Sequence, residues 1–224
     1  MTTLTVLFAI FIALDVIGAA NFVWRGSIFD RLSDGAIVSE GEANVADGIS
    51  VGYGGLWLLL FLATAVVFIV WQYRHAVNAR TLGVHGGLAH PGWAIGGWFI
   101  PLANLVLPAR QIYRSSRAPR VVPSSGTIAL LVGWAIAMWV SQALDRAAWW
   151  LWTDADGFTS QDLEQSATSD YLSGVAAMID LVAAVLALLL VRMLTKRQDA
   201  AFDSWFVEEP AAPQGATVLD ARGL

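Results

Sequence analysis

The stretch WAIGGWFIPLANLVLP, residues 93–108, decides how this chain folds, because it is apolar but unlike the four longer apolar runs around it. Pro101 stands at its centre, Pro108 at its end and the pair Gly96-Gly97 near its start. Even an unbroken helix over these residues would reach only about 24 Å, whereas the hydrocarbon layer is roughly 30 Å thick. We therefore expect a broken re-entrant or interfacial segment whose freed backbone groups are buried in protein.

The four longer runs are each long enough to span a bilayer, which takes about 20 residues. They lie at about residues 3–24, 51–71, 125–152 and 171–195. With 57% hydrophobic and 14% charged residues and a mean hydropathy of +0.60, the composition is that of a membrane protein. The prediction is an all-α polytopic bundle of four spanning helices over residues 1–198, followed by a disordered cytoplasmic tail, 199–224. Three aromatics in residues 201–207 suggest a docking segment for a partner, for the bundle itself or for the membrane surface.

The loops are strongly polarised in charge. Residues 25–50 and 153–170 are acidic, whereas residues 72–92, residues 110–124 and the end of the last run are basic. The positive-inside rule then predicts a multi-pass protein with both termini in the cytoplasm. A topology in which residues 93–108 also cross, giving five crossings with the N-terminus outside, would divide the Lys and Arg residues between the two sides of the membrane equally well. A faint repeat, Ala-Leu-Asp ending at Asp15 and again at Asp145, favours four crossings because it requires the first and fourth runs to point the same way.

Four ionisable residues fall within the apolar runs, where each is by default a hypothesis about packing or function: Asp15, Asp145, Arg146 and Asp180. Measured from the outer interface, they lie at similar depths of about 9 to 13 Å. We expect Arg146 to bridge Asp15 and Asp180. The simplest role for this cluster is a structural ion-pair network, because buried charge is tolerated mainly when it is paired. The alternative is a relay for protons or a solute.

The region from Gly55 to Arg117 resembles a family of mostly actinobacterial membrane proteins known as domain of unknown function 4328. The resemblance rests on the two stretches WQYRHAVNARTLG and PGWAIGGWFIPLANLVLPARQIYR, and it extends to the end of the last run. It implies a multi-helix protein of the bacterial plasma membrane, with no assigned reaction and no catalytic residue. It also implies that the cytoplasmic half is the part the family shares, with the motif residues Trp71, Arg74, Asn78, Trp98, Pro101, Asn104 and Pro108.

The sequence offers little catalytic or metal-binding chemistry. It has no cysteine, and no nucleotide-binding, metalloprotease or hydrolase motif occurs. His75, His85 and His90 fall in one predicted loop without an acid, so we expect solvated histidines and no metal site. Asp154, Asp156 and Asp162 resemble a fragment of a calcium loop, but a polar outer loop fits better. The alternative is a short helix capped by Thr159 and Asp162. We expect a non-enzyme with no cofactor, no metal and no nucleic-acid partner.

Arginines recur at helical spacing after the proline-broken segment: Arg110, Arg114, Arg117 and Arg120. If residues 109–118 form a helix, the first three share one face, which describes an interfacial helix that binds anionic lipid headgroups. The equally simple reading is the positive charge that every cytoplasmic loop carries.

Taken together, these features favour a non-enzymatic accessory or interaction subunit. Its partners would be membrane lipids, a second membrane protein or further copies of itself. The alternative is a small transporter or channel that uses the intramembrane Asp and Arg residues. Against transport, the charges are expected near the outer side and the broken segment near the inner side, with no polar path between them.

Overall fold

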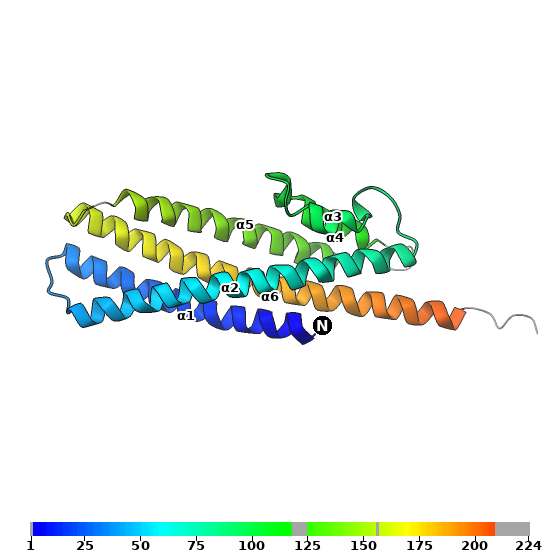
Figure 1. Ribbon diagram of the computed structural model, residues 1–224, viewed down its shortest axis with the longest axis horizontal. Helices are drawn as coiled ribbons and strands as arrows, with labels where there is room; N and C mark the ends of the chain where they lie inside the picture. Colours follow the sequence, from blue (N-terminus) through cyan, green and yellow to red (C-terminus); the bar gives the residue numbers. More distant parts are fainter. Residues whose placement is uncertain (1, 118–124, 156, 209–224) are drawn as a thin grey trace, which may run out of the picture.

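Four long helices make up most of the molecule in the computed structural model, which describes residues 2–117, 125–155 and 157–208 (Figure 1). They are α1 (Thr2–Ser33), α2 (Glu40–Thr81), α5 (Ser125–Asp154) and α6 (Ser160–Glu208). Each is long and apolar enough to cross a membrane. Four short elements separate α2 from α5: η1 (Gly87–Ala89), α3 (Gly92–Gly96), η2 (Ala103–Leu105) and α4 (Leu107–Ser115). The predicted all-α bundle with four spanning helices is confirmed.

The long helices alternate in direction along one axis (Figure 1). The end of α1 and start of α2, and the end of α5 and start of α6, lie at one end of the molecule, which we call the acidic end. Residues 82–117 and the last turns of α6 lie at the other, the basic end. Because α2 ends and α5 begins at the basic end, the segment between them returns to the side it came from. α1 and α5 therefore run in the same direction, as the repeat predicts, and an arrangement with five crossings does not fit.

The helices extend well beyond the apolar runs that predict them. α2 begins at Glu40, where the side chain of Ser39 accepts a hydrogen bond from the Glu42 amide at 3.2 Å. α6 begins after the predicted cap: the Thr159 hydroxyl accepts from the Asp162 amide, and the Thr159 amide donates to the Asp162 carboxylate at 3.0 Å. This reciprocal pair satisfies two backbone donors of the first turn. The acidic segments are therefore mostly helical, and the acidic-end connections are short.

The predicted disordered tail is wrong in its first part. Residues 199–208 continue α6, because no proline or glycine interrupts the helix before Pro210. Ala201 is buried and Phe202 partly buried in a small cluster with Ala79 and Leu82 of α2. This part of the aromatic segment thus packs on the protein's own bundle. The remainder of the tail, 209–224, lies outside the described residues.

α6 is the central helix: it packs along both α1 and α5, and α1 in turn packs on α2. Small residues allow these close approaches. A Cβ at Gly18 would lie 2.3 Å from the ring of Tyr53 on α2, and one at Gly26 would lie 2.9 Å from the ring of Tyr171 on α6. On α6 the contact face carries alanines, a composition that lets helix backbones approach inside a membrane: Ala176, Ala177, Ala183, Ala184 and Ala187.

The segment 91–116 fills the gap between α2 and α5 near the basic end. The Trp98 ring packs against Phe68 of α2 at 6.1 Å and against Trp134 of α5 at 6.5 Å. Farther in, the indole N–H of Trp139 donates to the backbone carbonyl of Leu105 at 3.2 Å. Trp139 lies midway along α5, so the segment reaches the middle of the bundle. The Leu105 carbonyl, which accepts no hydrogen bond within a regular helix, thus receives one from a side chain of the protein. This is expected for non-helical backbone at membrane depth.

The turn at the tip of this segment is strained. Leu102 has a φ of 62° and a ψ of −38°, and the Ala103 amide donates to the Pro101 carbonyl at 2.7 Å. This combination is a γ-turn of the rare kind with positive φ. Pro101 and Leu102 are exposed, so the tip points out of the bundle.

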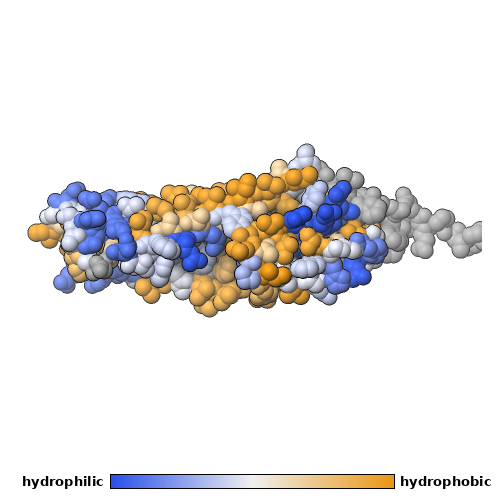
Figure 2. Space-filling view, turned by 90° about the horizontal axis from the view of Figure 1, so that it is seen from above, coloured by the Kyte–Doolittle hydropathy of each residue, from blue (hydrophilic) through white to orange (hydrophobic). Residues whose placement is uncertain are grey.

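The surface agrees with a membrane location. Apolar side chains cover most of the middle of the face seen in Figure 2, whereas hydrophilic side chains gather toward both ends. On α2 many large apolar residues are exposed along the middle of the helix, among them Leu56, Leu58, Leu59, Leu62 and Val66. Exposed apolar side chains on such a scale indicate contact with lipid rather than water.

Candidate functional site

A groove opens between α2 and α5 in the middle of the bundle. Its volume is about 610 Å³, within the range of roughly 300–1,000 Å³ that small-molecule sites occupy. α2 and α5 form its walls, α1 and α6 its floor, and the segment with Trp98 and Leu105 closes it toward the basic end. Aromatic rings dominate the lining: Phe8, Phe11, Trp57, Phe61, Phe68, Trp98, Trp134 and Trp139.

Five polar side chains also line the groove: Thr64, Asn104, Gln142, Arg146 and Asp180. Thr64 is 7% exposed, and its hydroxyl has no hydrogen-bond partner in the described part of the protein. Asn104 belongs to the broken segment, whereas Arg146 and Asp180 belong to the predicted charge cluster. The sequence suggested that these two regions are separate. In the structure they line the same cavity, although its lining between them is mainly aromatic.

Three acids lie close to one another near this groove: Asp180 lines it, whereas Asp15 and the exposed Asp145 do not. Asp15 on α1 is fully buried, and both Asp180 and Asp145 are close enough to interact with it electrostatically. Tyr53 and Trp57 of α2 lie beside Asp15, but neither of its Oδ atoms has a hydrogen bond of normal geometry within the described ranges. Asp180 accepts a hydrogen bond from the Ser141 hydroxyl at 2.7 Å. We call Asp15, Asp145 and Asp180 the acid cluster.

The predicted bridge by Arg146 does not form. In the ranges that the structure describes, no ion pair joins Arg146 to Asp15, Asp145 or Asp180. Arg146 is exposed on α5 and contributes to the groove wall, while the buried Asp15 faces α2. Neighbouring positions on a helix point about 100° apart, so Asp145 and Arg146 cannot both face the same partner. The acid cluster therefore lacks the cation that the sequence assigned to it.

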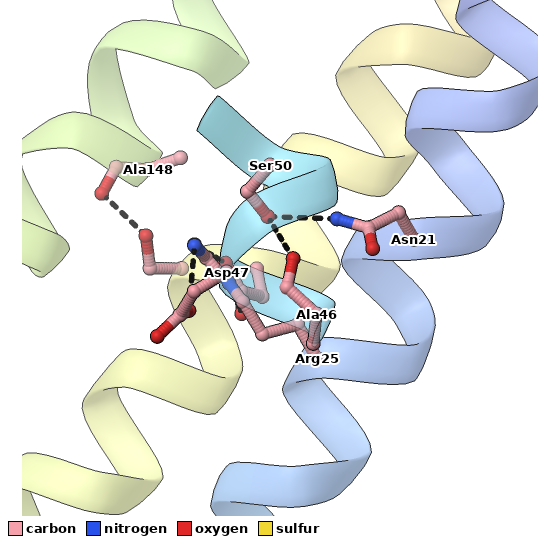
Figure 3. Close-up of polar contacts among 8 residues, drawn as sticks. Asn21, Arg25, Ala46, Asp47, Ser50 and Ala148 are labelled. Atoms are coloured by element: carbon pink, nitrogen blue, oxygen red, sulfur yellow. Dashed lines mark hydrogen bonds and ion pairs between the residues drawn. The ribbon is translucent and has the colours of Figure 1, made fainter. Parts of the chain in front are cut away.

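A different arginine makes a buried ion pair in the part of the chain that the structure describes. Arg25 of α1 donates from Nε and a terminal nitrogen to both oxygens of Asp170 on α6, at 2.7 and 2.5 Å (Figure 3). Asp47 of α2 lies 3.7 Å from the same guanidinium, which also stacks over the Trp152 ring of α5 at 4.9 Å. Arg25 thus contacts all four long helices at the acidic end. Sequence reasoning placed it in a loop, although its position directly after the apolar run and the surplus of acids around it were the available signals.

Two neutral hydrogen bonds flank this ion pair. Asn21 donates to the Ser50 hydroxyl at 2.7 Å, joining α1 to α2, and Ser169 donates to the Ala148 carbonyl at 2.8 Å, joining α6 to α5 (Figure 3). Each is one helical turn or less from Arg25 or Asp170. The acidic end is therefore closed by polar contacts between neighbouring helices.

A second buried polar network holds the broken segment at the basic end. Gln72 of α2 accepts from the Trp98 indole at 2.9 Å, and it donates to the Gln111 side chain at 2.8 Å and to the Pro108 carbonyl at 3.3 Å. Trp98 and Pro108 are motif residues of the resemblance. Gln72 and Gln111 were missed, although both lie within the two stretches that carry the resemblance.

His75 departs from its prediction as a solvated loop residue. It is 2% exposed inside α2, contacts the Ser116 hydroxyl at 3.2 Å and stacks on the Trp71 ring at 5.4 Å. His85 and His90 are exposed as expected. No group of three His, Asp or Glu side chains in the described residues has a geometry that could hold a metal ion.

The other motif residues have mixed roles. Trp71 donates to the Thr195 hydroxyl on α6 at 3.2 Å, Asn104 lines the groove, and Pro101 is exposed at the tip. Arg74 and Asn78 are exposed on α2. The resemblance therefore marks residues that position the broken segment more than residues that share one site.

The arginines after the broken segment lie as the sequence predicts. α4 buries Pro108, Gln111, Ile112 and Ser115 and exposes Arg110 and Arg114, with Arg117 exposed directly after it. Arg117 stacks on the Tyr113 ring at 5.6 Å. Arg120 lies outside the described residues. The helix is amphipathic, with a basic outer face at the basic end of the molecule.

Comparison with known protein families gives a match, whereas no curated protein and no solved structure matches the chain. The matching family is described as "Domain of unknown function (DUF4328)", and it covers residues 34–196. The match begins before α2 and ends near the close of the apolar part of α6, so it includes the broken segment, most of the groove and Asp145, Arg146 and Asp180. Because the match covers well over half of the chain, this protein belongs to the DUF4328 family.

Proposed function

We propose that this protein is a non-enzymatic binding module of the membrane, whose groove between α2 and α5 receives a small apolar or amphiphilic molecule. The groove itself is the observation that supports this function most directly. Packing normally fills the space between helices, yet here α2 and α5 are held apart over about 610 Å³ lined mainly by aromatic rings. Concave, mostly apolar cavities with a few polar groups are the usual form of small-molecule sites.

The proposal includes the orientation and the lipid contacts of the module. The basic end would face the cytoplasm of a bacterial plasma membrane, following the positive-inside rule. There the exposed Arg110, Arg114 and Arg117 would contact anionic headgroups, each contributing about 1 kcal/mol. An accessory role toward another membrane protein or a further copy of the chain is compatible with such a module.

A matched pair of variants on α2 tests the use of the groove. Ala65 lines the groove, whereas Ala63, two residues away, is exposed and does not. Protein extracted with its native lipids into polymer discs would be analysed by native mass spectrometry for small molecules bound in fixed proportion. Such a molecule should be lost in Ala65→Phe and kept in Ala63→Phe. Equal loadings in both variants, or no bound molecule in the unaltered protein, would contradict the proposal.

Transport of a small solute is the second candidate, and the shared cavity is what favours it. Asn104 on the broken segment and Arg146 and Asp180 near the acidic end line the same groove. Broken helices at membrane depth are a common way to build transporter sites. Flux into proteoliposomes that is lost in Asp180→Asn would favour this candidate, and binding without flux would favour the binding module.

A further inference from the structure

The electrostatic balance around the groove identifies the class of molecule that it binds. Asp180 lines the groove and the buried Asp15 lies close to it, and neither has an ion pair in the described part of the chain. Arg146 is the one basic residue lining the groove. Buried charges are screened less than exposed ones. The partly buried Asp180 therefore counts for more inside the groove than the exposed Arg146 does.

The aromatic lining favours the same sign of charge. Ring faces carry partial negative charge and attract cations, and cages of aromatic side chains are the usual sites for quaternary ammonium groups. Four of the rings around the groove are tryptophans, the most effective of the aromatic residues for this purpose. They are Trp57, Trp98, Trp134 and Trp139. An anion would meet both these ring faces and the carboxylate of Asp180.

Thr64 adds an independent sign that the groove is built for an occupant. Its hydroxyl is more than nine-tenths buried on the groove wall and has no partner within the described residues. A buried polar group without a hydrogen bond costs about 1–3 kcal/mol. A molecule or its accompanying water in the groove would supply the missing partner.

We propose that the groove between α2 and α5 binds a lipophilic organic cation, with its apolar substituents against the aromatic rings and its positive charge near Asp180 and Asp15. This inference rests on the proposed binding function and assigns its ligand class. Arg146 has a defined place in it: as the like charge on the groove wall, it weakens binding and so limits which cations the groove retains. Without a bound cation, Asp180 and Asp15 would have no opposite charge to pair with inside the bundle.

The test uses two ions of nearly the same shape and opposite charge. Binding of tetraphenylphosphonium and tetraphenylborate to the purified full-length protein in neutral detergent would be measured by equilibrium dialysis. We expect saturable binding of the phosphonium and no saturable binding of the borate. Asp180→Asn should lower the phosphonium affinity at least tenfold, and Arg146→Gln should raise it severalfold. A rise in affinity also shows that the variant is folded.

The control for Asp180 is Glu164→Gln, which removes an exposed acid of the same helix away from the groove and should leave binding unchanged. Saturable borate binding that depends on Arg146 would overturn the cation assignment. If Ala65→Phe also abolished this borate binding, the groove would still be a binding site, but for an anion. Phosphonium binding that is equal in Asp180→Asn, or no saturable binding of either ion, would likewise overturn the inference. The native mass spectrometry of Ala65→Phe and Ala63→Phe tests the binding function separately.

Discussion

A buried acid lies at the acidic end and another beside the groove, but among the described residues only the one at the acidic end has an ion pair. Asp170 is 1% exposed and receives two hydrogen bonds from Arg25. Asp15, also fully buried, has neither an ion pair nor a well-formed hydrogen bond in the described residues. A paired buried acid can be explained by structure alone, because it joins helices. An unpaired one calls for something the protein binds, and this difference separates the part that holds the fold from the part that forms the site.

Removing the cation from the acidic end should have the largest effect on stability. Arg25→Met leaves Asp170 buried without its partner, and breaking such a pair costs about 3 kcal/mol or more. We expect a strongly lowered melting temperature in detergent. If the melting temperature changed no more than in an exposed-arginine variant, Arg25 would not be the residue that closes this end.

The basic end extends the comparison to a buried network without charge. Gln72→Leu removes the acceptor of the Trp98 indole and the donor to Gln111 and the Pro108 carbonyl. Stranded buried polar groups cost about 1–3 kcal/mol, so the expected loss is about 2 kcal/mol, less than for Arg25. Tyr73→Phe, on the exposed face one residue away, serves as the control. A melting temperature equal to that of the control would show that other contacts hold the broken segment.

The groove should tolerate the loss of its own acid. Asp180→Asn keeps an oxygen that can accept from Ser141 and removes a charge that has no ion pair within the described residues. We expect the free energy of unfolding to change by less than about 1 kcal/mol. Thermal melting of the ligand-free protein measures it. A loss as large as that of Arg25→Met would place Asp180 in the structural framework and remove the distinction between the two regions.

The smallest effect is expected for the exposed pair at the acidic end. Arg31 bonds to Glu42 across the connection between α1 and α2, with 45% and 29% of the side chains exposed. Exposed ion pairs contribute about 0–1 kcal/mol. Arg31→Met should therefore barely move the melting temperature, and what change there is should vanish in high salt. A large, salt-independent loss would mean that exposure does not decide which pairs hold this end.

The sequence predicts the architecture well because the relevant physics is local. Helix length, the broken residues 93–108 and the arginine spacing on α4 all follow from residues near one another in the chain. The cap formed by Thr159 and Asp162 is equally local. The lengths of the helices were underestimated because they were taken from the apolar runs. The boundary of an apolar run marks where contact with lipid ends, not where the helix ends.

The site could be predicted only in part, because its geometry depends on how distant helices rotate against one another. The four intramembrane charges were found, and the structure brings Asp15, Asp145 and Asp180 together. The partner of the buried acid was misassigned because adjacent positions on α5 point in different directions. The same limitation applies to Arg25, whose partner is 145 residues away, and to the meeting of Asn104 with Asp180 in one groove.

The most direct measurement compares two neutral substitutions of buried acids, Asp170→Asn and Asp15→Asn, by thermal unfolding of the full-length protein in the same detergent. Asp170→Asn strands Arg25 and should lower the free energy of unfolding by about 3 kcal/mol, whereas Asp15→Asn strands no cation and should leave the protein as stable as before or more so. Equal losses in the two variants, or a larger loss in Asp15→Asn, would contradict the division between a paired framework and an unpaired site.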